Sequence, residues 1–131
     1  MKINSFKDIE VWQKARVLFQ EIYIICKKLE KEKEFSISDQ IKRSAMSIMA
    51  NIAEGFARQT SKEFIQFLFI ANGSAVEVNS HLYCIHDLGF IDNKTFEELE
   101  VKVTVIQKML SGFIKYLRKT TKKTKVTKQT I

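Results

Sequence analysis

The side chains best suited to metal or acid–base chemistry are Glu77, His81 and His86. Glu77 and His81 are four residues apart, so on a helix they would share a face and could in principle bind a metal ion. Di-iron bundles, however, use a Glu-x-x-His motif twice, together with two further inward glutamates. Here Ser80 is the third residue after Glu77, and no second such motif exists. We therefore expect a solvent-facing or hydrogen-bonded pair, with no metal and no cofactor.

No other pattern in the chain points to catalysis, which needs a nucleophile or an acid–base pair held in a pocket. Glycine-rich phosphate loops and Gly-x-Ser-x-Gly elbows are absent. Cys26 and Cys84 have no CxxC spacing, and each falls on an apolar helical stripe, where a thiol packs as a small hydrophobic group. The sequence therefore predicts a protein that is not an enzyme.

Composition favours a single domain made of a few long helices. The 131 residues include four Gly and no Pro, which is too few turn residues for a loop-rich or all-β fold. No stretch approaches the roughly 18 apolar residues of a membrane span, and residues 1–13 lack the apolar centre of a signal peptide. We expect a cytoplasmic protein without a membrane partner.

Apolar residues recur at alternating spacings of three and four in four segments, which is typical of helices with one buried face. These segments predict helices at about residues 5–31, 36–58, 61–88 and 93–118. Ser36 or Ser38 could cap the second helix, and Thr60 with Glu63 forms a capping box for the third. Gly89 stands where a left-handed stop is needed, and Asp92 can open the last helix.

Helices joined by short links pack as antiparallel neighbours. The predicted fold is therefore all-α, an antiparallel up-down-up-down four-helix bundle over residues 1–118. Residues 119–131 are rich in Lys and Thr and lack an apolar stripe, so we expect a disordered basic tail.

The net charge of +7 is placed unevenly, because nine of the 22 basic residues and no acidic residue follow Glu100. In the predicted topology, the ends of the second and fourth helices share one pole with the starts of the first and third. Such a basic pole suggests an acidic partner, although a Lys-rich end that only aids solubility is the alternative. The candidate nucleic-acid-binding residues are Arg58, Lys62, Lys115, Arg118, Lys119, Lys122, Lys123 and Lys125.

Small and polar residues recur along one side of the second and third predicted helices. We expect them to form a polar seam that fixes the register of the two helices, with direct ligand contact as the alternative. A glycine in mid-helix costs about 1 kcal/mol relative to Ala, so Gly73 indicates a close helix crossing. The candidate seam residues are Arg43, Ser44, Asn51, Glu54, Gly55, Gly73, Ser74 and Glu77.

The third predicted helix carries a second apolar stripe beside its core stripe, formed by Ile65, Phe69, Val76 and Tyr83. A stripe of this length favours a subunit interface, and a wider core face is the alternative.

Three segments of the chain carry a family resemblance: residues 6–15, residues 40–58 with Asn51-Ile52-Ala53-Glu54-Gly55, and residues 71–77. They resemble signatures of the four-helix-bundle proteins encoded in 23S rRNA intervening sequences. The accessory variability protein of diversity-generating retroelements is similar to that family. The likeness covers about residues 5–118, in order and at compatible spacing.

The resemblance implies a four-helix protomer in a homopentameric ring, with a basic surface that binds nucleic acid. In the retroelement branch it also implies a reverse transcriptase as partner. Relatives commonly carry proline where this chain has Met49, and proline would bend the second helix. Met49 therefore leaves the ring geometry open.

The leading hypothesis is a non-enzymatic, homo-oligomeric protein that contacts RNA or DNA phosphates electrostatically and with low sequence specificity. The alternative is a protein-interaction scaffold, such as an accessory subunit of a reverse transcriptase.

Overall fold

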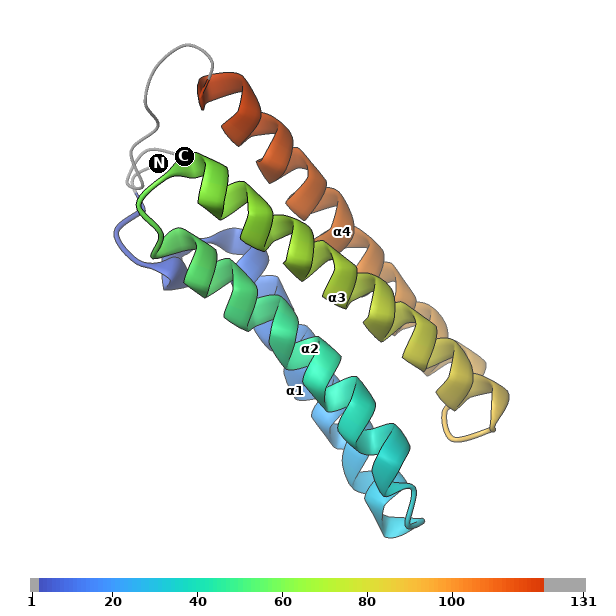
Figure 1. Ribbon diagram of the computed structural model, residues 1–131. Coiled ribbons are helices and arrows are strands. Elements are labelled where there is room, and N and C mark those ends of the chain that lie inside the picture. Colours follow the sequence, from blue (N-terminus) through green and yellow to red (C-terminus); the bar gives the residue numbers. More distant parts are fainter. Residues whose placement is uncertain (1–2, 122–131) are drawn as a thin grey trace.

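The chain folds into four long helices that lie side by side, and the computed structural model describes residues 3–121 (Figure 1). A single turn of 3-10 helix, η1 (Phe6–Asp8), precedes α1 (Glu10–Lys31), α2 (Phe35–Phe56), α3 (Ser61–Asp87) and α4 (Asn93–Thr121). Residues 3–121 contain no strand. Each helix runs antiparallel to the one before it, so the predicted all-α four-helix bundle is confirmed.

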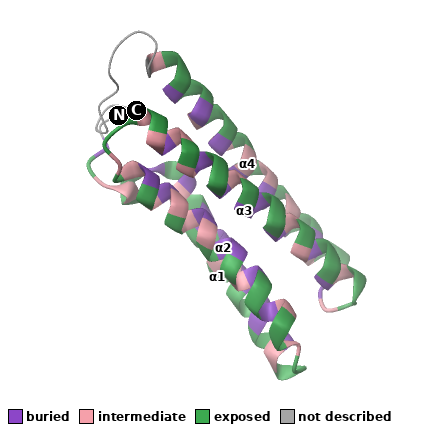
Figure 2. Cartoon of the chain, in the orientation of Figure 1, coloured by how far each residue is buried: buried purple, intermediate pink, exposed green. Residues whose placement is uncertain are grey.

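The core is formed by the inward faces of all four helices, which Figure 2 shows as buried stripes. α2 and α3 make the most extensive contact, whereas α1 and α4 make the least extensive of the four neighbouring pairs. Burying one Leu or Ile side chain contributes about 1.5–3 kcal/mol. The largest fully buried side chains are Leu18, Ile22, Leu29, Ile41, Ile48, Ile52, Leu68, Leu82, Ile85, Ile106, Leu110 and Leu117.

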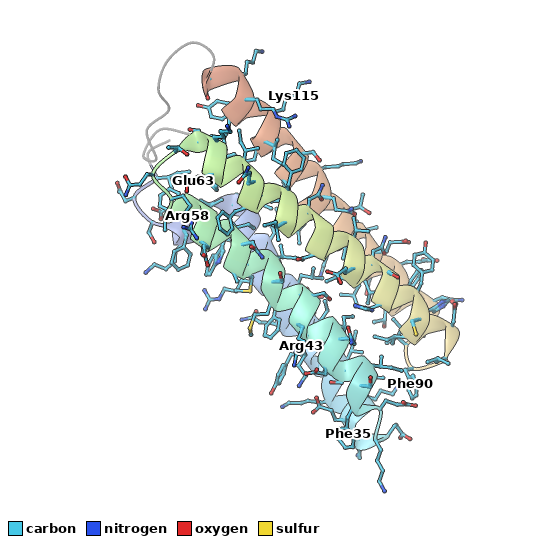
Figure 3. All side chains as sticks on the ribbon, viewed as in Figure 1. Phe35, Arg43, Arg58, Glu63, Phe90 and Lys115 are labelled. Atoms are coloured by element: carbon cyan, nitrogen blue, oxygen red, sulfur yellow. The ribbon has the colours of Figure 1, made fainter. Side chains whose placement is uncertain are left out.

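The antiparallel arrangement gives the bundle two chemically different ends (Figure 3). Arg58 and Lys115 lie at the end where α2 and α4 finish, and Phe35 and Phe90 lie at the opposite end. The structure therefore confirms the prediction that the ends of α2 and α4 lie at the same pole.

The first helix begins later than predicted, at Glu10 rather than at residue 5 or 6. Asp8 accepts hydrogen bonds from the backbone amides of Asn4 (3.0 Å) and Ser5 (3.1 Å), which closes η1 as a separate turn. Ile9 then adopts extended backbone and is only 3% exposed. Burial of this side chain draws the chain into the core before α1 starts.

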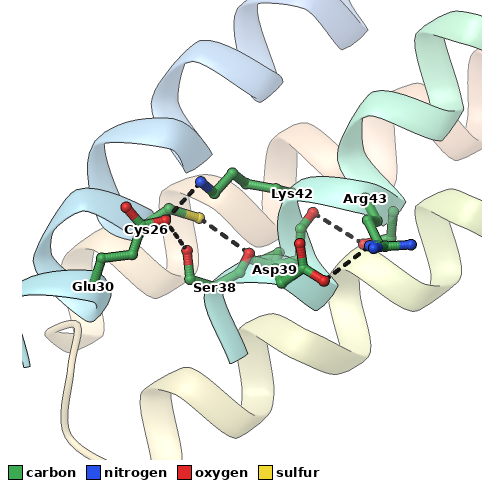
Figure 4. Close-up of polar contacts among 8 residues, drawn as sticks. Cys26, Glu30, Ser38, Asp39, Lys42 and Arg43 are labelled. Atoms are coloured by element: carbon green, nitrogen blue, oxygen red, sulfur yellow. Dashed lines mark hydrogen bonds and ion pairs between the residues drawn. The ribbon is translucent and has the colours of Figure 1, made fainter. Parts of the chain in front are cut away.

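The predicted serine cap of α2 is wrong. The helix begins at Phe35 after Glu34, and no side chain caps it. Ser38 is instead fully buried, and its hydroxyl donates to Glu30 Oε2 at 2.6 Å (Figure 4). Lys42 reaches the same oxygen at 2.6 Å, and the Cys26 thiol donates to the Ser38 carbonyl at 3.6 Å. These contacts join α1 to α2 beside their connection.

Thr60 and Asp92 cap α3 and α4 as predicted. The Thr60 hydroxyl accepts from the Glu63 amide at 3.2 Å, and Asp92 Oδ1 accepts from the Thr95 amide at 2.8 Å. The second half of the predicted capping box is not formed within the described residues, because Glu63 Oε1 accepts from the Thr60 hydroxyl at 3.1 Å instead of from the Thr60 amide. Gly89 has a φ of 83°, and its amide donates to the His86 carbonyl, which ends α3 in a left-handed turn.

Two helix ends differ from the prediction. α2 finishes at Phe56 and runs without interruption through Met49. α4 continues to Thr121, so Lys119 belongs to a helix rather than to a tail. The rest of the predicted tail, residues 122–131, lies outside the described residues.

The Glu30 contacts predict a pH-dependent contribution to stability. The hydrogen bond from Lys42, and then that from Ser38, hold the pKa of Glu30 below its ordinary value of 4.5, and Glu30 in turn raises the pKa of Lys42. A lowered folded-state pKa stabilises the fold above pH 4.5, and this stabilisation is lost as the pH falls through the folded-state value. Glu30→Gln should therefore lower Tm at pH 7, and the difference from wild type should vanish in acid.

Thermal unfolding monitored by circular dichroism between pH 2.5 and 8 checks this. Glu32→Gln is the matched control, since Glu32 is exposed and its side chain has no hydrogen bond or ion pair within residues 3–121. A Tm difference for Glu30→Gln that stays constant with pH would contradict the assignment.

Candidate nucleic-acid interface

The cations predicted to bind nucleic acid gather around the first turns of α3. Lys62 is exposed in the first turn of α3, and Lys115 and Lys119 are exposed in the last turns of α4. Within residues 3–121 no ion pair involves these three lysines, so their charges are available to a ligand. Lys122, Lys123 and Lys125 lie outside the described residues.

Arg58 lies on the side of α3 that faces α2. Its guanidinium stands 4.7 Å from the centroid of the Phe67 ring and is paired with Glu54 Oε1 at 2.7 Å. The pair is solvent-accessible, with side chains 41% and 56% exposed, so Glu54 offsets the charge of Arg58 only in part.

Arg118 lies on the other side of α3, the side that faces α4. Its guanidinium is 5.1 Å from the centroid of the Phe69 ring, and no carboxylate among the described residues pairs with it. Phe67 and Phe69 are two residues apart and therefore point to nearly opposite sides of the helix. Arg58 and Arg118 thus flank α3. Lys62, seven residues before Phe69, lies at the start of the helix on the side of Arg118.

Contact with a ring holds a guanidinium in place without using its hydrogen-bond donors. A cation over an aromatic face gains about 0.5–1 kcal/mol at an exposed site. The five N–H donors of Arg118, and those of Arg58 that Glu54 does not use, remain able to bind a phosphate in the bidentate manner that a lysine cannot match. A third such pair, Arg16 over Trp12 at 5.8 Å, was not singled out in the sequence, although the spacing of four was visible.

The polar seam between α2 and α3 is smaller than predicted. Its interhelical link is a hydrogen bond between the hydroxyls of Ser47 and Ser74, at 2.8 Å. Asn51 supports it from one turn away by donating to the Ser47 hydroxyl at 2.9 Å and to the Ser47 carbonyl at 2.8 Å. The buried Ser44 hydroxyl donates to the Ile41 carbonyl of its own helix instead of crossing the seam.

The close helix crossing lies at Gly55, and its predicted position at Gly73 is wrong. A Cβ added at Gly55 would stand 2.7 Å from Phe67 Cβ and 2.8 Å from Phe64 Cδ1, closer than side-chain carbons approach one another. A Cβ added at Gly73 would meet nothing within 4 Å, because this residue lies on the exposed face of α3. Gly55 therefore sets how closely α2 and α3 approach.

Three charged residues predicted for the seam lie outside it. Arg43 is 78% exposed and pairs with Asp39 one turn away, at 2.9 Å. Glu54 forms an ion pair with Arg58, and Glu77 is exposed. Because each side chain points to solvent, its charge avoids the desolvation penalty of a buried position. The spacing of residues along one helix does not predict this orientation.

The second apolar stripe of α3 is exposed at three of its four predicted positions. Phe69, Val76 and Tyr83 are 47%, 52% and 47% exposed. Ile65 is different, because it is half-buried and packs against the core, as the alternative of a wider core face predicted for it. The Tyr83 hydroxyl donates to Glu100 Oε2 at 2.7 Å, which holds this ring beside α4.

The acid–base candidates do not form a site. Glu77 is exposed, whereas Nε2 of His81 is buried and has no hydrogen-bond partner among the described atoms. His86 stacks on Phe96 and contacts Asn93 Oδ1 at 2.6 Å. In the described part of the chain, no group of three or more His, Cys, Asp or Glu residues is placed to hold a metal ion.

None of the helices within residues 3–121 is both long enough and apolar enough to cross a membrane.

The fold defines the class of the protein, which is that of antiparallel four-helix-bundle proteins. Within that class, the model of the 23S rRNA-intervening sequence protein family matches residues 7–112. The chain belongs to this family.

A solved structure gives the same assignment. The chain is 34% identical to a protein of unknown function from the S23 ribosomal protein family of Bacteroides thetaiotaomicron. The match covers 80% of this chain and 98% of that one, with a TM-score of 0.76. No curated protein matches the chain.

The two glycines provide a matched pair of substitutions. Gly55→Ala should destabilise the protein by about 1–3 kcal/mol, because the new Cβ overlaps Phe64 and Phe67. Gly73→Ala should leave stability unchanged or raise it by up to about 1 kcal/mol, because it adds helix propensity in open space. Denaturation in guanidinium chloride measures both, and equal effects at the two positions would contradict the assignment of the crossing.

Proposed function

We propose that the chain is a non-enzymatic, homo-oligomeric protein that binds RNA or DNA through its basic end. Contact is largely electrostatic and is made to phosphates, so sequence specificity is low. The residues assigned to this contact are those that flank the start of α3 and finish α4, together with the lysines after residue 121.

The observation that carries this proposal is the placement of Arg58, Lys62 and Arg118 around the start of α3. Cations in the last turn of α4 are favoured by the helix dipole, so Arg118 and Lys119 have a structural reason to be there. Lys62 stands at the positive N-terminal end of α3, where the dipole disfavours a cation. Helix stability therefore does not explain this residue, whereas contact with an anionic ligand does.

Assembly would strengthen such contacts. In a ring, copies of the basic end align on one rim, and several weak phosphate contacts act together on one strand. The family resemblance implies a ring of five, and the exposed stripe Phe69–Val76–Tyr83 supports self-association. Light scattering should give a mass several times the 15.3 kDa of one chain, and a mass of one chain would refute the oligomer.

A protein-interaction scaffold, such as an accessory subunit of a reverse transcriptase, is the second candidate. The exposed apolar side chains favour it, because a protein partner could cover them. A pull-down after nuclease treatment separates the two functions: a protein partner that persists favours the scaffold, and loss of all partners favours nucleic acid.

The salt dependence of binding tests the proposed contact. If Arg58, Lys62 and Arg118 each neutralise one phosphate, the triple change to Gln should lower the slope of log affinity against log salt. The expected decrease on single-stranded RNA is about 2 units, from about 0.7 per contact. Fluorescence anisotropy with a labelled oligonucleotide at several salt concentrations measures the slope.

The control removes the same charge from the opposite end, by changing the exposed residues Lys31, Lys33 and Lys94 to Gln. Its slope should match that of the wild type. Equal decreases in the two triple variants would show that only net charge matters and would contradict a localised interface.

A further inference from the structure

The bundle has a second apolar surface, a groove between α1 and α4. Val17, Val101 and Val105 line it and are 49%, 62% and 38% exposed. Ile24, 70% exposed, borders a neighbouring hollow beside the start of α4. This is also the neighbouring pair of helices with the least contact, so the protomer leaves these side chains uncovered.

The groove and the α3 stripe are on different faces that share α4. The stripe turns toward α4, since Phe69 contacts Arg118 and Tyr83 contacts Phe96 and Glu100. The groove is on the side of α4 that faces α1, where Lys102 pairs with Glu21 at 2.6 Å. Two unlike apolar faces on one protomer are what a heterologous, head-to-tail contact between copies requires.

The two faces match in direction and spacing. α1 and α3 both start at the basic end and run the same way. The stripe advances by seven residues from Phe69 to Val76 to Tyr83, and the exposed α1 positions Val17 and Ile24 are also seven residues apart. A parallel helix pair brings side chains together at this repeat.

The apolar side chains of the two faces also lie at the same level along the axis of α4. On one face, Phe64 meets Phe113 and Tyr83 meets Phe96, so Val76 lies between these two levels. On the other face, Val17 shares its groove with Val101 and Val105, which lie between the same two levels. A rotation about an axis parallel to the helices therefore brings Val76 of one copy to Val17 and Val101 of the next.

Charge agrees with this register at the basic end. Glu10 lies in a hollow beside Met109 and Phe113, the level at which α4 also contacts Phe64. Arg118 is one helical turn after Ile114, and its guanidinium lies over the ring of Phe69, which belongs to the stripe. Neither Glu10 nor Arg118 has an ion pair within the described residues, so in this register Glu10 of one copy meets Arg118 of the next. The five N–H donors of Arg118 allow it to contact this carboxylate and a phosphate together.

We propose that the α3 stripe of one copy occupies the α1–α4 groove of the next copy, with Val76 against Val17 and Val101. This inference rests on the homo-oligomer proposed above and names the surfaces that form it. Adjacent faces of a four-helix bundle have normals about 90° apart, and a closed ring needs about 90° for four copies and about 108° for five. The contact thus closes a small ring with α4 nearest the axis.

Two substitutions separate the halves of this contact. Val76→Glu disables the stripe and Val101→Glu disables the groove, and both residues are exposed, so each variant should keep the helical spectrum of the wild type. Each variant alone should have the 15.3 kDa mass of one chain, because every contact needs one intact stripe and one intact groove. Met46→Glu, 54% exposed on α2 and outside both faces, should assemble like the wild type.

Mixing the two variants gives the sharpest result. The intact groove of Val76→Glu can take the intact stripe of Val101→Glu, and no further copy can add, so light scattering should show a doubling of mass and nothing larger. A mixture that stays at the mass of one chain would overturn the pairing of these two surfaces.

Failure of this inference is distinct from failure of the proposed function. If the wild type assembles and both Glu variants assemble equally well, the surfaces are wrong and the oligomer stands. A wild type with the mass of one chain overturns the oligomer and this contact together. An assembled wild type that binds no oligonucleotide, with both Glu variants reduced to single chains, overturns the nucleic-acid function alone.

Discussion

Each of the four helices has to bury one apolar stripe, and the short connections allow this only if consecutive helices run in opposite directions. Burial of each large aliphatic side chain contributes about 1.5–3 kcal/mol, whereas an exposed ion pair contributes about 0–1 kcal/mol. Apolar burial therefore decides the arrangement, and the charged residues are carried to wherever the helices end. The gathering of cations at one end is a consequence of this packing.

The bundle is uneven around its circumference. Between α2 and α3 the backbones come close at Gly55, and the Ser47–Ser74 hydrogen bond links the two helices. Between α1 and α4 the structure shows a groove with exposed valines and one cross-helix ion pair, Glu21–Lys102. The tight seam holds the protomer together, and the open one leaves apolar surface available for association.

The aromatic rings near the basic end link these surfaces. Phe67 belongs to the tight seam through Gly55 and also lies under Arg58. Phe69 belongs to the exposed stripe and lies under Arg118. Two aromatic residues on opposite sides of α3 thus serve packing and charge placement at once. Because Phe69 belongs to the stripe, any contact at the stripe also changes the environment of Arg118.

Much of the fold was predictable from the sequence because it depends on local patterns. The spacing of apolar residues gave four helices, and Thr60, Gly89 and Asp92 marked their limits because capping involves only nearby backbone groups. The start of α1 was mispredicted, since burial of Ile9 is a tertiary effect that interrupts an otherwise helical pattern. The Ser38 contact with Glu30 was missed for the same reason, because its partner lies on another helix.

The sequence by itself determined the helix count, the antiparallel order and the end at which the cations gather, since these follow from periodicity and link length. Only the tertiary structure decided which glycine allows the close helix crossing, which lies at Gly55 and not at Gly73. It also decided that Arg43, Glu54 and Glu77 point to solvent and that Val17 and Val101 share a groove. Such outcomes depend on how each helix is rotated about its axis against its neighbours, and the packing of all four helices fixes those rotations together.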